Sequence, residues 1–429
     1  MRRILIVAIA TTLALAMWAV ALGAGVLEGW WHQPLASPGD TKAFGAAAIR
    51  SIDQGNVGNT AFALLKNGVV VERHFVSVGA PVDDDTLFQV ASVSKWITAF
   101  GVMHLVDQGK LDLDAPVSKY LTRWHLPASE FDNRGVTIRR LLSHTAGLTD
   151  GLGYAGFAPG KKIQTIEQSL CAADDPSPGA DGHVRVGYEP GRDWKYSGGG
   201  FTLLQLVIEE VTHQPFNSFM RHAVLKPFGM SRSTYVLPPE ASNVAIFYNL
   251  DGGPAIHYRF TAVAAASLYT STHDLSRLLA AQITGPNGEA PGRGVVKPAT
   301  LALMRTPHGV QYGFPIWGLG TILYAPNNAG GFVVGHDGDN APAINTAARV
   351  DPATGDGIVV LESGNRRLAS NIASEWVFWH TGHPDLFMVL TDTNRLFPML
   401  VAGWMVILLG GVFAWWRWRR ISPARLQAP

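Results

Sequence analysis

Two long uncharged segments stand near the ends of the chain. Residues 4–24 and 396–416 contain no charged side chain and are mostly apolar. A helix of about 20 apolar residues crosses the roughly 30 Å hydrocarbon core of a bilayer. We therefore predict a transmembrane helix over residues 396–416. Over residues 1–24 the length of the run favours an N-terminal transmembrane anchor, while the small residues Ala19 and Ala21 leave a cleaved signal peptide as the alternative.

Arginines flank both segments on their outer sides. They are Arg2 and Arg3 before the first segment, and Arg417, Arg419 and Arg420 after the second. Because Lys and Arg accumulate on the cytoplasmic side of spans, we expect both termini, including a tail over residues 417–429, to lie in the cytoplasm. The chain between the segments would then lie outside the cytoplasmic membrane, as a linker over residues 25–39 and a folded domain over residues 40–385.

The pattern within residues 40–385 mixes strands and helices. Runs typical of strands are residues 60–65, 69–76, 317–324, 331–336, 343–350 and 357–362, and runs typical of helices are residues 94–108 and 203–211. Asn67-Gly68 predicts a hairpin between the first two strands. A Gly/Pro-rich stretch over residues 151–191 predicts a long loop. Since strands occur at both ends of the domain, we expect an α+β fold, with one antiparallel sheet flanked by helices and an inserted helical lobe.

Composition narrows the function classes. Hydrophobic residues make up 47% of the chain and charged residues 16%, which is enough for a sizeable core. Lys and Arg number 34 against 33 Asp and Glu, so nucleic acid is not an expected partner. The single cysteine, Cys171, excludes an internal disulfide and a cysteine-based zinc site.

The residues Ser92-Val93-Ser94-Lys95 form the one Ser-x-x-Lys motif of the chain. If Ser92 opens a helix, Lys95 lies one turn later on the same face, and its amine can reach the hydroxyl. Partial burial would lower the pKa of the amine toward that of a general base. Taken alone, the motif also fits a serine that caps a helix beside a solvated lysine.

Two further elements carry candidate chemistry. Tyr196 precedes the second predicted helix, and near a lysine amine it would relay protons. Taken alone, it also fits an ordinary half-buried tyrosine. His336 stands at the end of an apolar strand and is followed by Gly338 and Asp339. A glycine there would let a substrate backbone lie against the strand edge. Taken alone, His336 also fits a polar strand residue whose hydrogen bonds are satisfied within the protein.

In this order and at these separations, the three elements resemble the penicillin-recognising serine hydrolases, which include class C β-lactamases, DD-peptidases and their esterase and D-aminopeptidase relatives. Residues 141–148, Leu-Leu-Ser-His-Thr-Ala-Gly-Leu, are similar to the Leu-Leu-x-His-Thr-Ser-Gly-Leu segment of that family, and residues 109–114 and 226–230 match two other recurrent stretches. The resemblance spans residues 60–365 and implies a β-lactamase/transpeptidase-like fold.

The resemblance also implies roles for individual residues. Ser92 would be the acylated nucleophile, Lys95 its base partner and Tyr196 the proton relay that activates the deacylating water. The backbone N–H groups of Ser92 and Asp339 would form the oxyanion hole, next to Gly338.

Two departures from the family pattern bear on the substrate. His336 stands where many members have the lysine of a Lys-Thr-Gly motif, which puts a fixed cation for a substrate carboxylate in doubt. Gly198 replaces the asparagine of a Tyr-x-Asn motif, whose amide binds the acylamino side chain of penicillins and peptides. We therefore expect esters to be favoured over β-lactams.

Together these observations predict a membrane-tethered, extracytoplasmic serine hydrolase that acts through a Ser92 acyl-enzyme on a small ester, amide or peptide. No cofactor or metal is expected, and membrane lipid would contact the terminal helices. A β-lactamase or DD-peptidase is the first alternative. A penicillin-binding sensor without turnover is the second, although the tail after Arg420 is short for an effector. His380 and His383 make a weak metal site, and the Gly-x-Ser-x-Gly motif of α/β-hydrolases is absent from the sequence.

Overall fold

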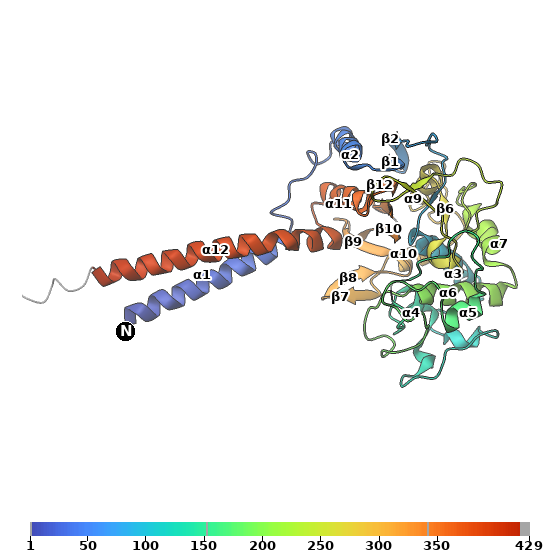
Figure 1. Ribbon diagram of the computed structural model, residues 1–429, viewed down its shortest axis with the longest axis horizontal. Helices are drawn as coiled ribbons and strands as arrows, with labels where there is room; N and C mark the ends of the chain where they lie inside the picture. Colours follow the sequence, from blue (N-terminus) through green and yellow to red (C-terminus); the bar gives the residue numbers. More distant parts are fainter. Residues whose placement is uncertain (1, 152, 341–342, 421–429) are drawn as a thin grey trace, which may run out of the picture.

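An eight-stranded antiparallel sheet forms the centre of the computed structural model, which describes residues 2–151, 153–340 and 343–420 (Figure 1). Its strand order is β2-β1-β12-β11-β10-β9-β8-β7. The strands are β1 (Thr60–Lys66), β2 (Val69–Val76), β7 (Gly309–Gln311), β8 (Phe314–Trp317), β9 (Ile322–Pro326), β10 (Phe332–Asn340), β11 (Ile344–Val350) and β12 (Gly357–Ser363). Because β1 pairs with β12, the sheet joins both ends of the domain, which confirms the predicted α+β arrangement.

The helices and the minor strands complete the chain. The helices are α1 (Arg2–Leu27), α2 (Thr41–Gly55), α3 (Val93–Asp107), α4 (Ile138–Leu142), α5 (Ile166–Cys171), α6 (Gly198–Thr212), α7 (Phe216–Met220), α8 (Val263–Ala266), α9 (Thr272–Ala280), α10 (Pro298–Met304), α11 (Leu368–Thr381) and α12 (Leu386–Arg420). Short helical turns are η1 (Val117–Lys119), η2 (Asn133–Gly135) and η3 (Arg221–Leu225), and short strands are β3 (Phe88–Gln89), β4 (Phe247–Tyr248), β5 (Pro254–Ala255) and β6 (Tyr269–Thr270).

Each face of the sheet has its own apolar core. Helices α2 and α11 cover one face, where Phe44 and Trp376 are fully buried against Val360. Helix α3 and the lobe inserted between β2 and β7 cover the other face. Apolar side chains surround α3 on every side, with twelve of its fifteen residues buried, as expected for a central helix. The sheet and the surrounding core therefore hold the N-terminal end of α3 in a fixed position.

The structure corrects the predicted boundaries of two strands. Residues 317–324 do not form one strand, because β8 ends at Trp317 and β9 begins only at Ile322. Between them Gly320 adopts φ +76°, and a Cβ there would lie 2.2 Å from the Cβ of Ala99 on α3. The chain therefore turns where it contacts α3.

The second misplaced boundary is the end of β10. This strand extends to Asn340, so His336 lies inside the strand and not at its end. Pairing with β9 stops at Gly335, but pairing with β11 continues to Asn340 and Ile344.

The predicted loop over residues 151–191 is largely irregular, and it contains the short helix α5, which begins with a capping box of Thr165 and Gln168.

The terminal helices α1 and α12 lie side by side and leave the domain at the same end (Figure 1). Residues Ile4–Leu27 and Leu396–Arg420 are long and apolar enough to cross a membrane. Trp18 donates its indole N–H to the Met399 carbonyl (3.3 Å), and Trp404 donates to the Leu15 carbonyl (3.2 Å). The two helices thus form an antiparallel pair with polar contacts between them.

Residues 25–39, predicted as a linker, pack against α11. The His32 Nε2 atom lies 3.0 Å from Glu375 Oε2, and Trp379 donates its indole N–H to the Ser37 carbonyl (2.8 Å). Gly29 approaches the ring of Phe378 so closely that a Cβ there would lie 2.3 Å from it. The connection between α1 and the domain is therefore held in place.

Candidate active site

Ser92 stands at the N-terminal end of α3, directly after a tight turn. Ala91 in this turn adopts φ +45°, an uncommon conformation for a residue with a Cβ. The Ser94 hydroxyl donates to the Ala91 carbonyl (2.5 Å) and accepts the Leu268 N–H (2.9 Å), which fixes the turn. The Ser92 hydroxyl makes no hydrogen bond that caps the helix. Helix capping therefore does not account for this serine.

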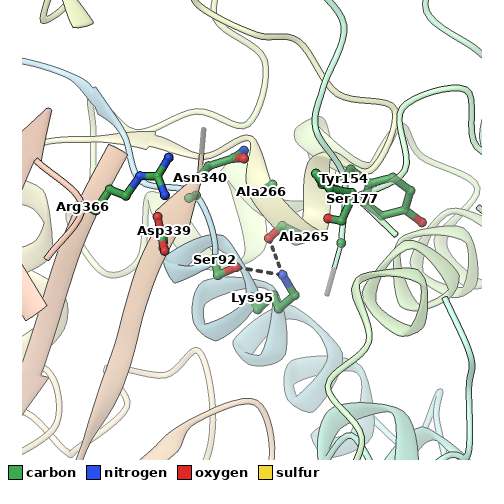
Figure 2. A pocket seen from close by; sticks show the side chains of 12 residues that line it. Ser92, Lys95, Tyr154, Ser177, Ala265, Ala266, Asp339, Asn340 and Arg366 are labelled. Carbon is green, nitrogen blue, oxygen red and sulfur yellow. Dashed lines mark hydrogen bonds between the residues drawn. The ribbon is translucent and has the colours of Figure 1, made fainter. Parts of the chain in front are cut away.

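Lys95 is almost completely buried, with 2% of its surface exposed. Its Nζ atom lies 3.1 Å from Ser92 Oγ and donates to the Ala265 carbonyl at 2.8 Å (Figure 2). Burial lowers the pKa of Lys95 to about 7, an effect that the Asp150 carboxylate opposes in part. A substantial fraction of the amine is therefore neutral near pH 7 and able to accept a proton.

Tyr196 completes the contact set of the serine. Its phenolic O–H donates to Ser92 Oγ at 2.9 Å, and its ring lies 5.0 Å from Lys95 Nζ. Burial raises the pKa of Tyr196, so the isolated phenol stays protonated. The next residue, Ser197, caps α6 through a hydrogen bond from the Gly200 N–H (2.8 Å), and the start of this helix therefore fixes the position of Tyr196.

An aromatic cluster supports the Tyr196 ring from behind. His144 packs on it with centroids 4.4 Å apart, and Trp317 packs on His144 at 4.7 Å. The His144 Nδ1 atom accepts the Ser197 N–H (3.1 Å). Burial holds the pKa of His144 well below its usual value, so this histidine is neutral and plays a packing role. In the sequence, His144 stands out only as part of the segment 141–148.

Asp150 is a buried carboxylate near the site that the sequence did not reveal. It accepts the Ser197 hydroxyl at 2.5 Å and the Gly199 N–H at 2.7 Å. Burial raises the pKa of Asp150 to about 6, and the charge of Lys95 works in the opposite direction. A lone aspartate at the edge of a loop gave no signal in the sequence, because only the fold brings it close enough to Lys95 for the two charges to interact.

A cleft of about 470 Å³ opens above Ser92 and Lys95. Asp339, Asn340 and Arg366 lie to one side of Ser92, and Tyr154 and Ser177 lie to the other (Figure 2). The remaining lining residues are Ala91, Gly153, Pro178, Ala265 and Ala266. Tyr154, Ser177 and Arg366 were not predicted as site residues, since they come from loops without a motif.

Gly338 brings β10 close to the turn that carries Ser92. A Cβ at this position would lie 2.1 Å from the Val90 carbonyl oxygen and 2.5 Å from Thr346 Oγ1. Only glycine permits this approach, and it places Asp339 in the wall of the cleft near Ser92. Gly338 itself is not among the residues that line the cleft, so contact between the two chain segments accounts for this glycine without a substrate.

His336 is buried, and its ring packs edge-on against Trp317 with centroids 5.3 Å apart. Its Nδ1 atom lies 2.6 Å from the Asp337 carbonyl oxygen. Burial lowers the pKa of His336 to about 4. At neutral pH the ring is therefore uncharged and does not supply a fixed cation to the cleft.

Gly198 is the buried first residue of α6. A Cβ at this position would lie 2.6 Å from the Cα of Gly153 and 3.3 Å from the Tyr154 ring. The space into which a longer side chain would extend is thus filled by the loop that bears Gly153 and Tyr154. An asparagine at position 198 would require this loop to move.

Comparison with known proteins identifies the family. A family model described as Beta-lactamase matches residues 42–376. The chain belongs to this family. The β-lactamase/transpeptidase-like fold class predicted from the sequence is therefore confirmed.

Individual Beta-lactamase family relatives are distant. Esterase EstB of Burkholderia gladioli is 32% identical over 187 residues, which cover 41% of this chain and 45% of the esterase. Protein flp of Staphylococcus aureus (strain N315) is 23% identical over 250 residues, covering 55% of this chain and 47% of that protein. The chain thus spans about half the length of these curated relatives. An octameric penicillin-binding protein homologue from Pyrococcus abyssi superposes with a TM-score of 0.65 and 25% identity, over 80% of this chain and 78% of that chain.

The two histidines considered as metal ligands have separate partners. The His380 Nε2 atom lies 2.9 Å from Asp351 Oδ2, and the His383 Nε2 atom lies 3.2 Å from Asn328 Oδ1. Among the residues that the structure describes, no cluster of three or more His, Cys, Asp or Glu side chains suits a metal ion.

Proposed function

We propose that this protein is a membrane-tethered, extracytoplasmic serine hydrolase that acts through a Ser92 acyl-enzyme, with esters as its preferred substrates. One observation carries the proposal: Ser92 Oγ lies within hydrogen-bond distance of both Lys95 Nζ and Tyr196 Oη at the cleft. A hydroxyl between a neutral amine and a phenol has a proton acceptor and a proton relay in place before substrate arrives.

Acylation then follows from this geometry. Neutral Lys95 accepts the Ser92 proton while Oγ forms a bond to the carbonyl carbon of the ester. The backbone N–H groups of Ser92 and Asp339 stabilise the oxyanion. When the intermediate collapses, the bond between the carbonyl carbon and the alcohol oxygen breaks. Tyr196 gives its proton to the departing alcohol and receives the proton held by Lys95.

Deacylation repeats these transfers with water as the nucleophile. Water attacks the acyl carbon and passes a proton through Tyr196 to Lys95. The bond between the acyl carbon and Ser92 Oγ then breaks, the serine regains its proton from Lys95, and the carboxylic acid leaves. The cycle needs no cofactor.

Two features of the cleft favour esters over penicillins. Gly198 has no amide to bind an acylamino side chain, and its surroundings are closed by Gly153. The neutral His336 supplies no charge for a β-lactam carboxylate. A site favours one substrate strongly when its polar groups are left unpaired by other substrates. Positions 198 and 336 provide neither the amide nor the cation that would favour a penicillin in this way. The similarity to an esterase, EstB, points the same way.

A second candidate, hydrolysis of β-lactams or cell-wall peptides, has one observation in its favour. Arg366 is exposed at the margin of the cleft, next to Asp339. Its guanidinium would bind a substrate carboxylate in place of the lysine that His336 replaces.

The membrane part of the proposal rests on the terminal helices. Both are long and apolar enough to span a bilayer, and they leave the domain at one end. With arginines at the outer end of each span, both termini would face the cytoplasm and the cleft would lie outside.

The test uses the full-length protein in detergent with a fluorophosphonate probe, p-nitrophenyl butyrate and benzylpenicillin. We expect labelling of Ser92 by intact mass and peptide mapping, no labelling of Ser92→Ala, and a kcat/KM for the ester at least about 10²-fold above that for penicillin. Ser276→Ala, which removes a buried hydroxyl on α9 away from the cleft, should label as the wild type does. Labelling of the Ser92→Ala variant contradicts the mechanism, and a stable penicillin adduct without turnover indicates a sensor.

A further inference from the structure

A buried charged cluster lies on the face of the sheet opposite to Ser92. Its centre is Arg349 on β11, whose side chain is fully buried. Arg349 binds the carboxylates of Asp337 on β10 and Asp385 at the start of α12. The ring of Tyr324 lies 3.9 Å below the guanidinium. The cluster therefore connects three segments that are distant in the sequence.

On one side the cluster holds the part of β10 that borders the cleft. Asp337 stands between His336 and Gly338, with its side chain on the other face of the sheet. Arg349 binds its carboxylate through Nε (3.1 Å) and Nη2 (2.6 Å), and the Tyr324 hydroxyl donates to it at 2.7 Å.

The Asp337 contact is important because β10 no longer pairs with β9 at this point. Pairing with β9 ends at Gly335, so residues 336–340 pair only with β11. The contacts of Asp337 provide a second attachment for the segment that carries the proposed oxyanion N–H of Asp339.

On its other side the cluster holds the beginning of α12. Asp385, which is completely buried, accepts the Ser374 hydroxyl (2.7 Å) and caps the helix through the Met388 N–H (2.8 Å). Helix α12 then continues past Pro398 and through the apolar segment to Arg420. A displacement of α12 would therefore act on Arg349 directly.

We infer that Arg349 is a positioning residue that couples the C-terminal membrane-spanning helix to the oxyanion strand. The guanidinium binds Asp385 and Asp337 with different nitrogen atoms, so it transmits the position of the helix cap to β10. Hydrogen-bonded charge pairs of this kind are geometrically specific. The anchor would thus help to hold the site in its active geometry, in addition to tethering the domain.

The variant Asp385→Asn tests this coupling in the full-length protein. It leaves Arg349 paired with Asp337, so no buried charge is stranded, and the amide oxygen still caps α12. Asp356→Asn is the matched control, since Asp356 is also buried and ion-paired, with Lys66 Nζ at 2.6 Å, but does not contact β10 in the structure described.

Two measurements are made on both variants. The first, which rests on the proposed function, is steady-state hydrolysis of p-nitrophenyl butyrate. We expect Asp385→Asn to lower kcat about tenfold, with KM changed less than about twofold, because the oxyanion contact develops in the transition state. The second is amide hydrogen exchange in the peptide over residues 332–340. It should be at least about threefold faster in Asp385→Asn and unchanged in Asp356→Asn.

The outcomes separate the two proposals. A wild-type protein without ester hydrolysis and without Ser92 labelling refutes the proposed function, while the exchange measurement still decides the coupling. Exchange in residues 332–340 that is the same in both variants, or an equal loss of kcat in both, refutes the role of Arg349.

Discussion

Burial lowers the pKa of Lys95, so that this lysine can act as a base and not only as a cation. Its ammonium group has two hydrogen-bond acceptors, Ser92 Oγ and the Ala265 carbonyl, and almost no contact with water. Desolvation penalises the charged form and lowers the pKa to about 7, while the charge of Asp150 favours protonation. The pH dependence of the reaction should therefore report on these two residues together.

We predict that kcat/KM for an ester rises with pH through about 7 and levels off above it, because neutral Lys95 is the active form. Replacing Asp150 by Asn removes a negative charge that raises the pKa of Lys95, so this limb should move to lower pH. The measurement is kcat/KM from pH 5 to 9, and the position of the limb does not depend on the amount of folded enzyme. A limb that stays in place or moves to higher pH would contradict the charge interaction between Asp150 and Lys95.

Some candidate site residues could be predicted from the sequence and others could not, for a physical reason. Ser92 and Lys95 are one helical turn apart, so their proximity is fixed locally, and Tyr196 was found because it stands in a family motif. Arg366 and Asp150 reach the site only through the packing of distant segments. No local pattern indicates such contacts.

At the level of elements, local sequence patterns predicted correctly those helices and turns whose boundaries depend on neighbouring residues alone. The hairpin around Asn67 and the helix that ends before Gly109 match the structure closely. The break at Gly320 was missed because it depends on contact with Ala99. The extension of β10 to Asn340 depends on pairing with β11, which hydrophobic periodicity does not report.

Strand β12 carries a buried carboxyl that the proposed reaction does not use. Glu362 is 1% exposed, and both of its carboxyl oxygens are buried. Burial raises the pKa of Glu362 to about 9, and the backbone N–H of Asn365 offsets this only in part. The side chain is therefore protonated in the folded protein at neutral pH and ionised in the unfolded chain.

This difference predicts how stability changes with pH. Between 4.5, the ordinary pKa of a glutamate, and about 9 the folded state binds one more proton at Glu362 than the unfolded state. The contribution of Glu362 to the free energy of unfolding should therefore fall as pH rises, by up to about 1.4 kcal/mol per pH unit. The Glu362→Gln variant lacks this titration. The free energy of unfolding of the variant should therefore fall less between pH 6 and pH 8 than that of the wild type. Thermal unfolding of both proteins at the two pH values provides the measurement, and parallel curves would contradict the prediction.

At the scale of the whole molecule, the two terminal helices fit each other. Gly403 and Gly411 on α12 face α1, and a Cβ at Gly403 would lie 2.0 Å from the Trp18 indole nitrogen. Small residues let apolar helices approach closely in a bilayer. The adjacent Gly410 has nothing within 4 Å of its Cβ position. The absence of a side chain at Gly403 therefore allows the Trp18 ring of α1 to pack directly against α12.

This fit predicts that α1 is retained in the mature protein as the partner of α12. Cleavage after Ala21 would remove Trp18 and leave the surface around Gly403 without its partner. Intact mass of the purified protein should therefore include residues 1–21, and a mass that begins near residue 22 would show that the segment is a cleaved signal.

A cysteine pair tests the helix contact itself. A Cβ at Gly411 would lie 3.5 Å from the Cβ of Thr11, within the range of disulfides. In a Cys171→Ser background, the double variant Thr11→Cys/Gly411→Cys should form an internal disulfide under mild oxidation. The control Thr11→Cys/Gly410→Cys should form far less, because position 410 faces away from α1. Equal cross-linking of the two pairs would mean that α1 and α12 lack this fixed contact.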